Sequence, residues 1–247
     1  MKLLEFVMSF SLFISMLECK NLPKYLDRCS IKDPEEFSKC AISIAKKAAP
    51  QILKGDPDFK VQKLDPLKIP LLQLNAGPTL NLTLTNQIID GLSTVDIKSI
   101  TYDKATRKMT WDLLFDFIKL EGDYSIQGRI LILPIVGSGK GILNFKKAHL
   151  VFSYDVNIES HKNGKQTIRV ANTKLQTEFG GATFRMDNLF NGDKVLGDEM
   201  NRFLNDNWKE VLTEFEELVH SPMSSILGGV ASGFLNNLSF DAAFSTD

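Results

Sequence analysis

The chain has 247 residues, of which 43% are hydrophobic and 24% are charged, and its net charge is −1. This length is sufficient for one large all-β or α+β domain with a sizeable core. The near-neutral charge, with Lys and Arg residues scattered rather than arranged in a stripe, gives no electrostatic basis for binding nucleic acid or an anionic membrane.

The first residues have the pattern of an export signal. Lys2 supplies a positive charge, and residues 6–17 (FVMSFSLFISML) form an apolar stretch that is too short to span a membrane. We expect cleavage near Cys19-Lys20, so that residues 1–19 are a signal peptide and residues 20–247 are one mature domain. The alternative interpretation of this segment is a buried N-terminal helix. No later segment approaches the ~20 apolar residues of a membrane span, so we expect no stable membrane insertion.

Export determines how the three cysteines are interpreted. If Cys19 leaves with the signal, Cys29 and Cys40 remain as an even pair in an oxidising compartment, and we expect a disulfide between them. A zinc site is a poor alternative because two cysteines without nearby histidines cannot complete the metal's four ligands. A catalytic thiol is a poorer one, since nothing nearby would activate it.

The segment around Cys40 predicts a short helix over residues 34–49. Asp33-Pro34 provides the N-cap and a first-turn proline, and Pro50 predicts the end of the helix. The expected disulfide would therefore staple the entrance of this helix.

Residues 80–186 alternate apolar and polar side chains with a period of two, which predicts a meander of long antiparallel strands with one apolar face. A turn signal at residues 161–165 predicts a hairpin between two of these strands. Near residues 97–100 the inward phase slips by one position, which indicates a bulge. The alternation also places the glycosylation sequon at Asn81 on the outer face, and a second sequon lies at Asn237.

The C-terminal part follows helical spacing instead. Apolar side chains recur every three or four residues over 196–219, and the pattern continues to about Asn236 beyond a kink or restart at Ser221-Pro222. Three acidic side chains are interpreted as a solvated face opposite this stripe: Glu214, Glu216 and Glu217. Because the apolar face of the strands is too extensive to stay in water, we expect a strongly curved sheet wrapped around this helix.

Signals of catalysis or metal binding are weak. The run Gly137-Ser138-Gly139-Lys140-Gly141 has the wrong spacing for a P-loop and precedes a strand, so we expect a glycine-rich bend. No serine or cysteine has a recognisable base partner. The histidines have no metal-ligand spacing: His149, His161 and His220. We therefore expect no enzyme activity, no cofactor and no bound metal.

The run at residues 187–208 contains the most specific pattern in the chain. Its distinctive residues are Asn188, Leu189, Phe190, Asn191, Gly192, Leu196, Gly197, Asn201, Phe203, Leu204, Asn205, Asn207 and Trp208. Other landmarks along the chain are Leu22-Pro23, Cys29, Cys40, Gly55-Asp56-Pro57, Leu64-Asp65-Pro66-Leu67, Gly91-Leu92, Leu120-Glu121-Gly122-Asp123-Tyr124, Gly128, Leu133-Pro134, Gly137, Gly139 and Gly141. In identity and order these residues resemble the insect Takeout and haemolymph juvenile-hormone-binding protein family.

This resemblance implies an α+β tubular lipid-binding fold. A long C-terminal helix would be wrapped by a highly curved antiparallel β-sheet, with the short disulfide-stapled helix at the N-terminus and an apolar tunnel between sheet and helix. The expected tunnel-lining residues are Trp111, Leu113, Phe115, Tyr124, Ile126, Phe152, Tyr154, Phe184, Phe203, Val211 and Phe215. Selectivity would come from tunnel length and from a few polar groups near one end, with Trp111, Tyr124, Tyr154 and Thr177 as candidates.

The implied function is that of a secreted monomer, in haemolymph or chemosensory fluid, that carries an extended hydrophobic small molecule. A juvenile hormone-like isoprenoid, a fatty acid or a related lipid would fit. The alternative is a secreted signalling protein of the same fold that acts in feeding, circadian or chemosensory modulation through a receptor or partner protein. A third hypothesis, a secreted hydrolase of lipid esters, would require turnover of such an ester.

Overall fold

The structure is a computed structural model that describes residues 20–76, 79–161 and 166–245. The expected signal peptide and residues 162–165 of the expected hairpin turn lie outside the described residues and stay predictions. The helices are α1 (Pro34–Ile52), α2 (Lys194–Asp206), α3 (Trp208–Leu235) and α4 (Phe240–Ala243). The 3₁₀ turns are η1 (Pro57–Phe59), η2 (Leu92–Thr94) and η3 (Phe190–Gly192). The strands are β1 (Cys29–Ser30), β2 (Leu67–Ala76), β3 (Leu80–Asp90), β4 (Val95–Asp103), β5 (Lys108–Ile130), β6 (Leu133–Ser160), β7 (Gln166–Met186) and β8 (Phe244–Ser245).

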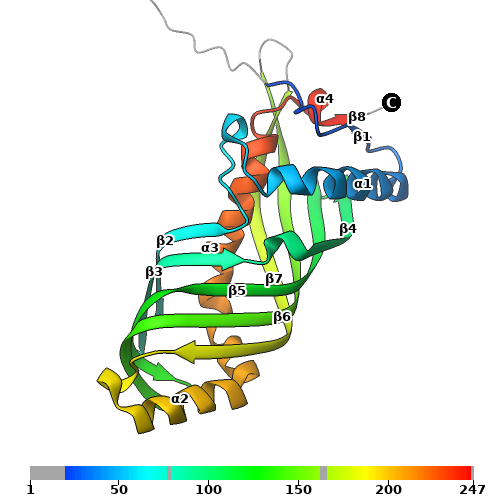
Figure 1. Cartoon of the computed structure of the whole chain (residues 1–247). Helices are drawn as coiled ribbons and strands as arrows, with labels where there is room; N and C mark the ends of the chain where they lie inside the picture. The colour runs from blue at the N-terminus through cyan, green and yellow to red at the C-terminus, as the bar shows by residue number, and fades with distance from the viewer. Residues whose placement is uncertain (1–19, 77–78, 162–165, 246–247) are drawn as a thin grey trace, which may run out of the picture.

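The main sheet has the strand order β2-β3-β5-β6-β7, and β4 also pairs with β5. Because β5 pairs with β4 along residues 108–115 and with β3 along residues 119–128, β3 and β4 lie end to end beside it. Figure 1 shows the sheet curling around α3, with α1 across one end and α2 across the other. The expected fold class, a curved antiparallel sheet around a long C-terminal helix, is confirmed.

One local prediction within the sheet is confirmed, and the glycine-rich run, for which a bend was expected, lies inside a strand. The pairing of β4 with β5 shifts register between Ile97 and Ser99, where the sequence indicated a bulge. The glycine-rich run lies inside β6, where a Cβ added to Gly139 would be 2.5 Å from the backbone oxygen of Asp187. This glycine is therefore required for close packing of two backbone segments.

The N-terminal helix extends further than the sequence predicted. It begins at Pro34, with the Asp33 carboxylate accepting hydrogen bonds from Glu35 N and Glu36 N, but it continues to Ile52 with Pro50 inside its last turn. A proline so close to the C-terminal end removes a single donor, and Leu53 N still donates to Ala49 O at 2.9 Å. The end predicted before Pro50 was wrong.

The C-terminal helix is interrupted at a different place from the one predicted. The break lies at Asn207, whose backbone leaves the helical region (φ −113°, ψ 32°) and whose side chain donates to Phe203 O at 2.8 Å. Pro222 lies inside α3, so the restart expected there was wrong, while a kink at this proline stays a prediction. As a result, α2 lies across the end of the sheet while α3 runs along its concave face (Figure 1).

Asparagine side chains form hydrogen bonds with backbone groups on the outer edge of β7. The amide of Asn205 accepts from Phe184 N at 2.9 Å and donates to Phe184 O at 2.8 Å, and Asn201 makes the same pair of bonds with Met186. Near the other end of the strand, Val170 N donates to the side-chain oxygen of Asn236. In the described sheet β7 has a neighbouring strand, β6, on one side only, and these amides supply partners to its other edge at Val170, Phe184 and Met186.

We expect Asn205→Leu to destabilise the protein by about 2–4 kcal/mol, because it leaves the backbone N–H and C=O of buried Phe184 without partners. Denaturant unfolding measures this loss. Asp206→Ala, at the exposed neighbouring position of the same helix, is the control and should change stability by less than about 0.5 kcal/mol. Equal unfolding midpoints for Asn205→Leu and wild type would contradict the role of this amide.

Cys29 and Cys40 form the expected disulfide, with Cα atoms 5.8 Å apart, and it joins β1 to α1.

Replacing both cysteines with serine should lower the free energy of unfolding by about 3 kcal/mol, since the disulfide closes a loop between residues 11 positions apart in the unfolded chain. Thermal unfolding with and without reductant measures the effect. The reduced wild type should match the variant, and a variant as stable as the oxidised wild type would refute a stabilising role.

Candidate functional site

A cavity of about 580 Å³ lies between the concave face of the sheet, α1 and α3. Its wall is almost entirely apolar and includes side chains from α1, from β2 to β7 and from one face of α3. Two groups of buried residues bound it, one beside α1 and one beside α2. A volume of this size is in the range of cavities that enclose small organic ligands.

Ten of the eleven residues predicted to line a tunnel are in the wall of this cavity. They are Trp111, Leu113, Phe115, Tyr124, Ile126, Phe152, Tyr154, Phe184, Val211 and Phe215. Phe203 is not in the wall: it packs half-buried in the core beside α2, while its neighbour Leu204 on the same helix lines the cavity. That any of these side chains contacts a ligand stays a prediction.

The sequence analysis missed the contributions of α1 and β2. Helix α1 lines the cavity with Phe37, Ala41, Ile44 and Ala45, and β2 does so with Ile69, Leu72 and Leu74. The spacing of the four α1 residues is that of an amphipathic helix and could have revealed this face. The β2 residues lie within a proline-containing run that alternates irregularly, which gives a weaker signal.

Helix α3 shows that the cavity is an unfilled part of the interior. Among the described residues, this helix is long and apolar enough to cross a membrane by length and composition, so the expectation that no later segment approaches a span was wrong. In its most apolar 18-residue stretch, 22% of the residues are buried. Much of its apolar surface borders the cavity from Val211 to Leu235, so these side chains face space that other protein groups do not fill.

Most polar groups in the wall already bind other protein atoms. The Tyr124 hydroxyl donates to Asp187 O at 2.6 Å, and the buried Gln87 amide nitrogen donates to Thr85 O and Asp123 O. The hydroxyl of Tyr124 therefore serves the junction with the segment after β7. Burial, followed by the Asp187 charge, raises the pKa of Tyr124 to about 12.

Trp111 and Tyr154 form a polar pair at the α1 end of the cavity. The indole nitrogen of Trp111 donates to the Tyr154 hydroxyl at 3.3 Å, and Tyr154 is 2% exposed. Burial raises the pKa of Tyr154 to about 12, although the Trp111 bond opposes the shift, so the phenol stays protonated near neutral pH. Its own O–H has no acceptor among the described residues.

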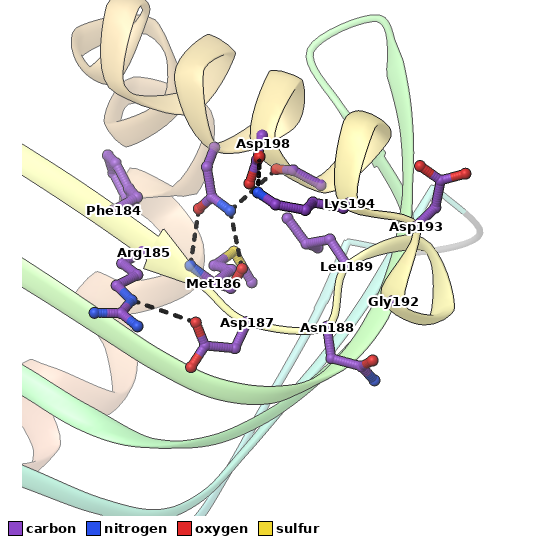
Figure 2. Close-up of a pocket in the computed structure, with 12 residues that line it drawn as sticks. Phe184, Arg185, Met186, Asp187, Asn188, Leu189, Gly192, Asp193, Lys194 and Asp198 are labelled. Carbon is purple, nitrogen blue, oxygen red and sulfur yellow. Dashed lines mark hydrogen bonds and ion pairs between the residues drawn. The ribbon is translucent and has the colours of Figure 1, made fainter.

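A second hollow, of about 550 Å³, lies on the surface where β7 meets α2. Figure 2 shows its charged side chains engaged with one another, Arg185 with Asp187 at 3.3 Å and Lys194 with Asp198 at 2.6 Å. The Asp193 side chain accepts from Leu196 N and caps α2. This hollow is built largely from the 187–208 run. The described contacts of this run hold α2 against β7 and indicate a structural role.

The described residues contain no group of three or more His, Cys, Asp or Glu side chains that could hold a metal ion. A site that catalyses hydrolysis through a covalent intermediate needs a nucleophile, an adjacent base and a third group that orients the base. One arrangement of these residue types lines the cavity: Thr177 with His220 and Glu216.

Comparisons with known proteins agree with this architecture. The profile of the family described as haemolymph juvenile hormone binding protein matches residues 6–245. The circadian clock-controlled protein daywake of Drosophila melanogaster is 22% identical, over 94% of this chain and 93% of its own length. Daywake of Drosophila yakuba is 21% identical, over 92% of this chain and 90% of its own length. The crystal structure of Epiphyas postvittana Takeout 1 superposes with a TM-score of 0.79 and 28% identity, covering 89% of this chain and all of that one.

Proposed function

The chain belongs to the haemolymph juvenile hormone binding protein family, and we propose that it is a secreted carrier of an extended hydrophobic small molecule. The observation that carries the proposal is the apolar cavity along α3. A juvenile hormone-like isoprenoid, a fatty acid or a related lipid has the matching shape and polarity. The family description names binding, and we propose that burial of the ligand is the whole activity.

The affinity would come from removing the ligand's apolar surface from water. About a dozen methylenes entering a dry cavity gain roughly 10 kcal/mol, at ~0.8 kcal/mol for each group. Loss of translational and conformational freedom offsets a substantial part of this gain, which leaves an affinity between micromolar and nanomolar. The Tyr154 hydroxyl supplies a hydrogen-bond donor for an oxygen of the ligand at the α1 end.

Secretion is part of the proposal. The apolar stretch at residues 6–17 follows Lys2 as in a signal peptide, so residues 1–19 would be removed and residues 20–247 would form the mature single domain. The disulfide suits an oxidising compartment, and the family description places its members in haemolymph. We propose a monomer in haemolymph or chemosensory fluid.

A second candidate is a signalling protein that acts through a receptor or another partner. The name of the Drosophila daywake proteins supports a link to circadian control. Lipid extraction and native mass spectrometry of protein from insect cells distinguish the two functions. A stoichiometric hydrophobic ligand supports the carrier, whereas protein that retains and accepts no lipid favours the partner-based role. Turnover of an added fatty-acyl ester would contradict a non-enzymatic function.

Filling the cavity should abolish much of the binding. Leu113 lines the cavity, whereas its neighbour Leu114 in β5 does not. We expect Leu113→Trp to weaken binding of a fluorescent fatty-acid probe roughly 30-fold, because the indole displaces two or three methylenes worth about 2 kcal/mol.

Leu114→Trp is the matched control, with the same substitution on the opposite face of the strand, and should bind like wild type. Circular dichroism and thermal unfolding establish that both variants fold. Equal binding by both variants, or equal loss in both, would show that the probe does not occupy this cavity.

Glycosylation of the two sequons provides a test of secretion, because glycans are attached to secreted proteins. Asn81 is exposed on β3, whereas Asn237 is half-buried and its amide nitrogen donates to Gly233 O at 2.6 Å. In protein secreted from insect cells we expect an N-glycosidase to release one glycan, which Asn81→Gln and Thr83→Ala abolish and Asn237→Gln leaves in place. A glycan that persists in both Asn81→Gln and Thr83→Ala would overturn this assignment.

A further inference from the structure

Three polar side chains meet in the apolar wall near the middle of the cavity. His220 and Glu216 lie one turn apart on α3, and Thr177 reaches them from β7; all three line the cavity. The Nε2 atom of His220 is 3.1 Å from Thr177 Oγ1 and 3.7 Å from Glu216 Oε1. Glu216, which the sequence analysis placed on a solvated face, therefore reaches both the solvent and the cavity.

The group lies part-way along the α3 side of the cavity. The cavity wall on α3 extends from Val211 to Leu235. With a rise of 1.5 Å per residue, His220 lies about 14 Å from the first of these residues and about 22 Å from the last. A ligand that lies along α3 would pass this point within its length rather than at an end.

The imidazole of His220 has unused hydrogen-bonding capacity. Its side chain is 21% exposed, and Nε2 contacts Thr177 and Glu216, while Nδ1 has no hydrogen-bond partner among the described residues. A polar ring in an apolar wall is stabilised when a partner satisfies it. An oxygen atom of a bound chain would provide such a partner where the protein does not.

The geometry favours binding over catalysis. In a Ser–His–Asp triad the nucleophile and the carboxylate contact opposite nitrogens of the imidazole. Here Thr177 and Glu216 both approach Nε2, so no carboxylate orients the ring through Nδ1. Glu216 also brings a carboxylate to the site, which disfavours a second carboxylate from a ligand.

We propose that His220 and Thr177 form a mid-cavity polar subsite for a neutral oxygen function, such as a hydroxyl, ketone or ester, within a long apolar ligand. The subsite selects oxygenated chains over hydrocarbons of the same length and over fatty acids. This inference rests on the proposed carrier function, since it concerns the ligand of the same cavity.

The test is displacement of a bound fluorescent lipid by three linear probes of equal carbon count: an alkane, a mid-chain ketone and a fatty acid. One hydrogen bond predicts that wild type prefers the ketone over the alkane roughly 5- to 10-fold. His220→Leu should remove this preference and leave alkane binding unchanged. His220→Gln, which keeps a donor and an acceptor, should retain it.

One further variant and the fatty-acid probe serve as controls. Glu217→Gln changes an exposed carboxylate on the same helix outside the cavity wall and should leave the ketone preference intact. The fatty acid, whose oxygens lie at one end of the chain, should bind equally to wild type and to His220→Leu. Thermal unfolding of each variant establishes that it folds.

The outcomes separate this inference from the function on which it rests. Wild type that binds the ketone and the alkane equally, or His220→Leu that weakens both equally, would overturn the subsite and leave the carrier function standing. If wild type binds none of the probes and retains no extracted lipid, the carrier function fails and the subsite with it.

Discussion

The fold depends on how the free edge of β7 is satisfied. A sheet this strongly curved could gain hydrogen bonds by closing into a barrel, and closure would leave no room for α3. Instead, the amides of Asn201, Asn205 and Asn236 pair with the backbone of β7 at its two ends. Between these points, α3 packs so closely that a Cβ on Gly228 would lie 2.7 Å from Thr173. Helices thus take the place of the missing strand, and the cavity remains inside.

The residues that identify the family and those that surround the cavity have different roles. Asn201 and Asn205 belong to the 187–208 run, and their described contacts hold α2 against β7. Asp187 O and Asn188, from the same run, contact Tyr124 and Ser138 O. The contacts between α2 and β7 require particular amides and glycines, whereas the apolar wall of a cavity tolerates many side chains of suitable volume. This difference explains why a family resemblance can be strong while the ligand stays unspecified.

Periodicity predicted the elements better than it predicted their ends. The alternation of residues 150–158 placed Phe152 and Tyr154 on the concave face because a strand with one buried face has a fixed register. The break at Asn207 was missed because asparagine is compatible with both a helix interior and a cap. Pro50 and Pro222 do not end their helices, since a proline removes one backbone donor and Pro50 lies in the last turn. The contact between Thr177 and His220 depends on how α3 is positioned against β7. The spacing of residues along the chain does not determine that position.

The sparse coverage of α3 has a thermodynamic consequence. An interior normally gains stability from mutual contact among its own side chains, but here a long apolar face borders unfilled space. A molecule that fits that space would complete the core, and linkage requires that it raise the unfolding free energy, by about 2.7 kcal/mol at a hundredfold excess over its dissociation constant. Ligand-bound and empty protein would then unfold to different extents, so the supply of such a molecule would affect the abundance of the protein.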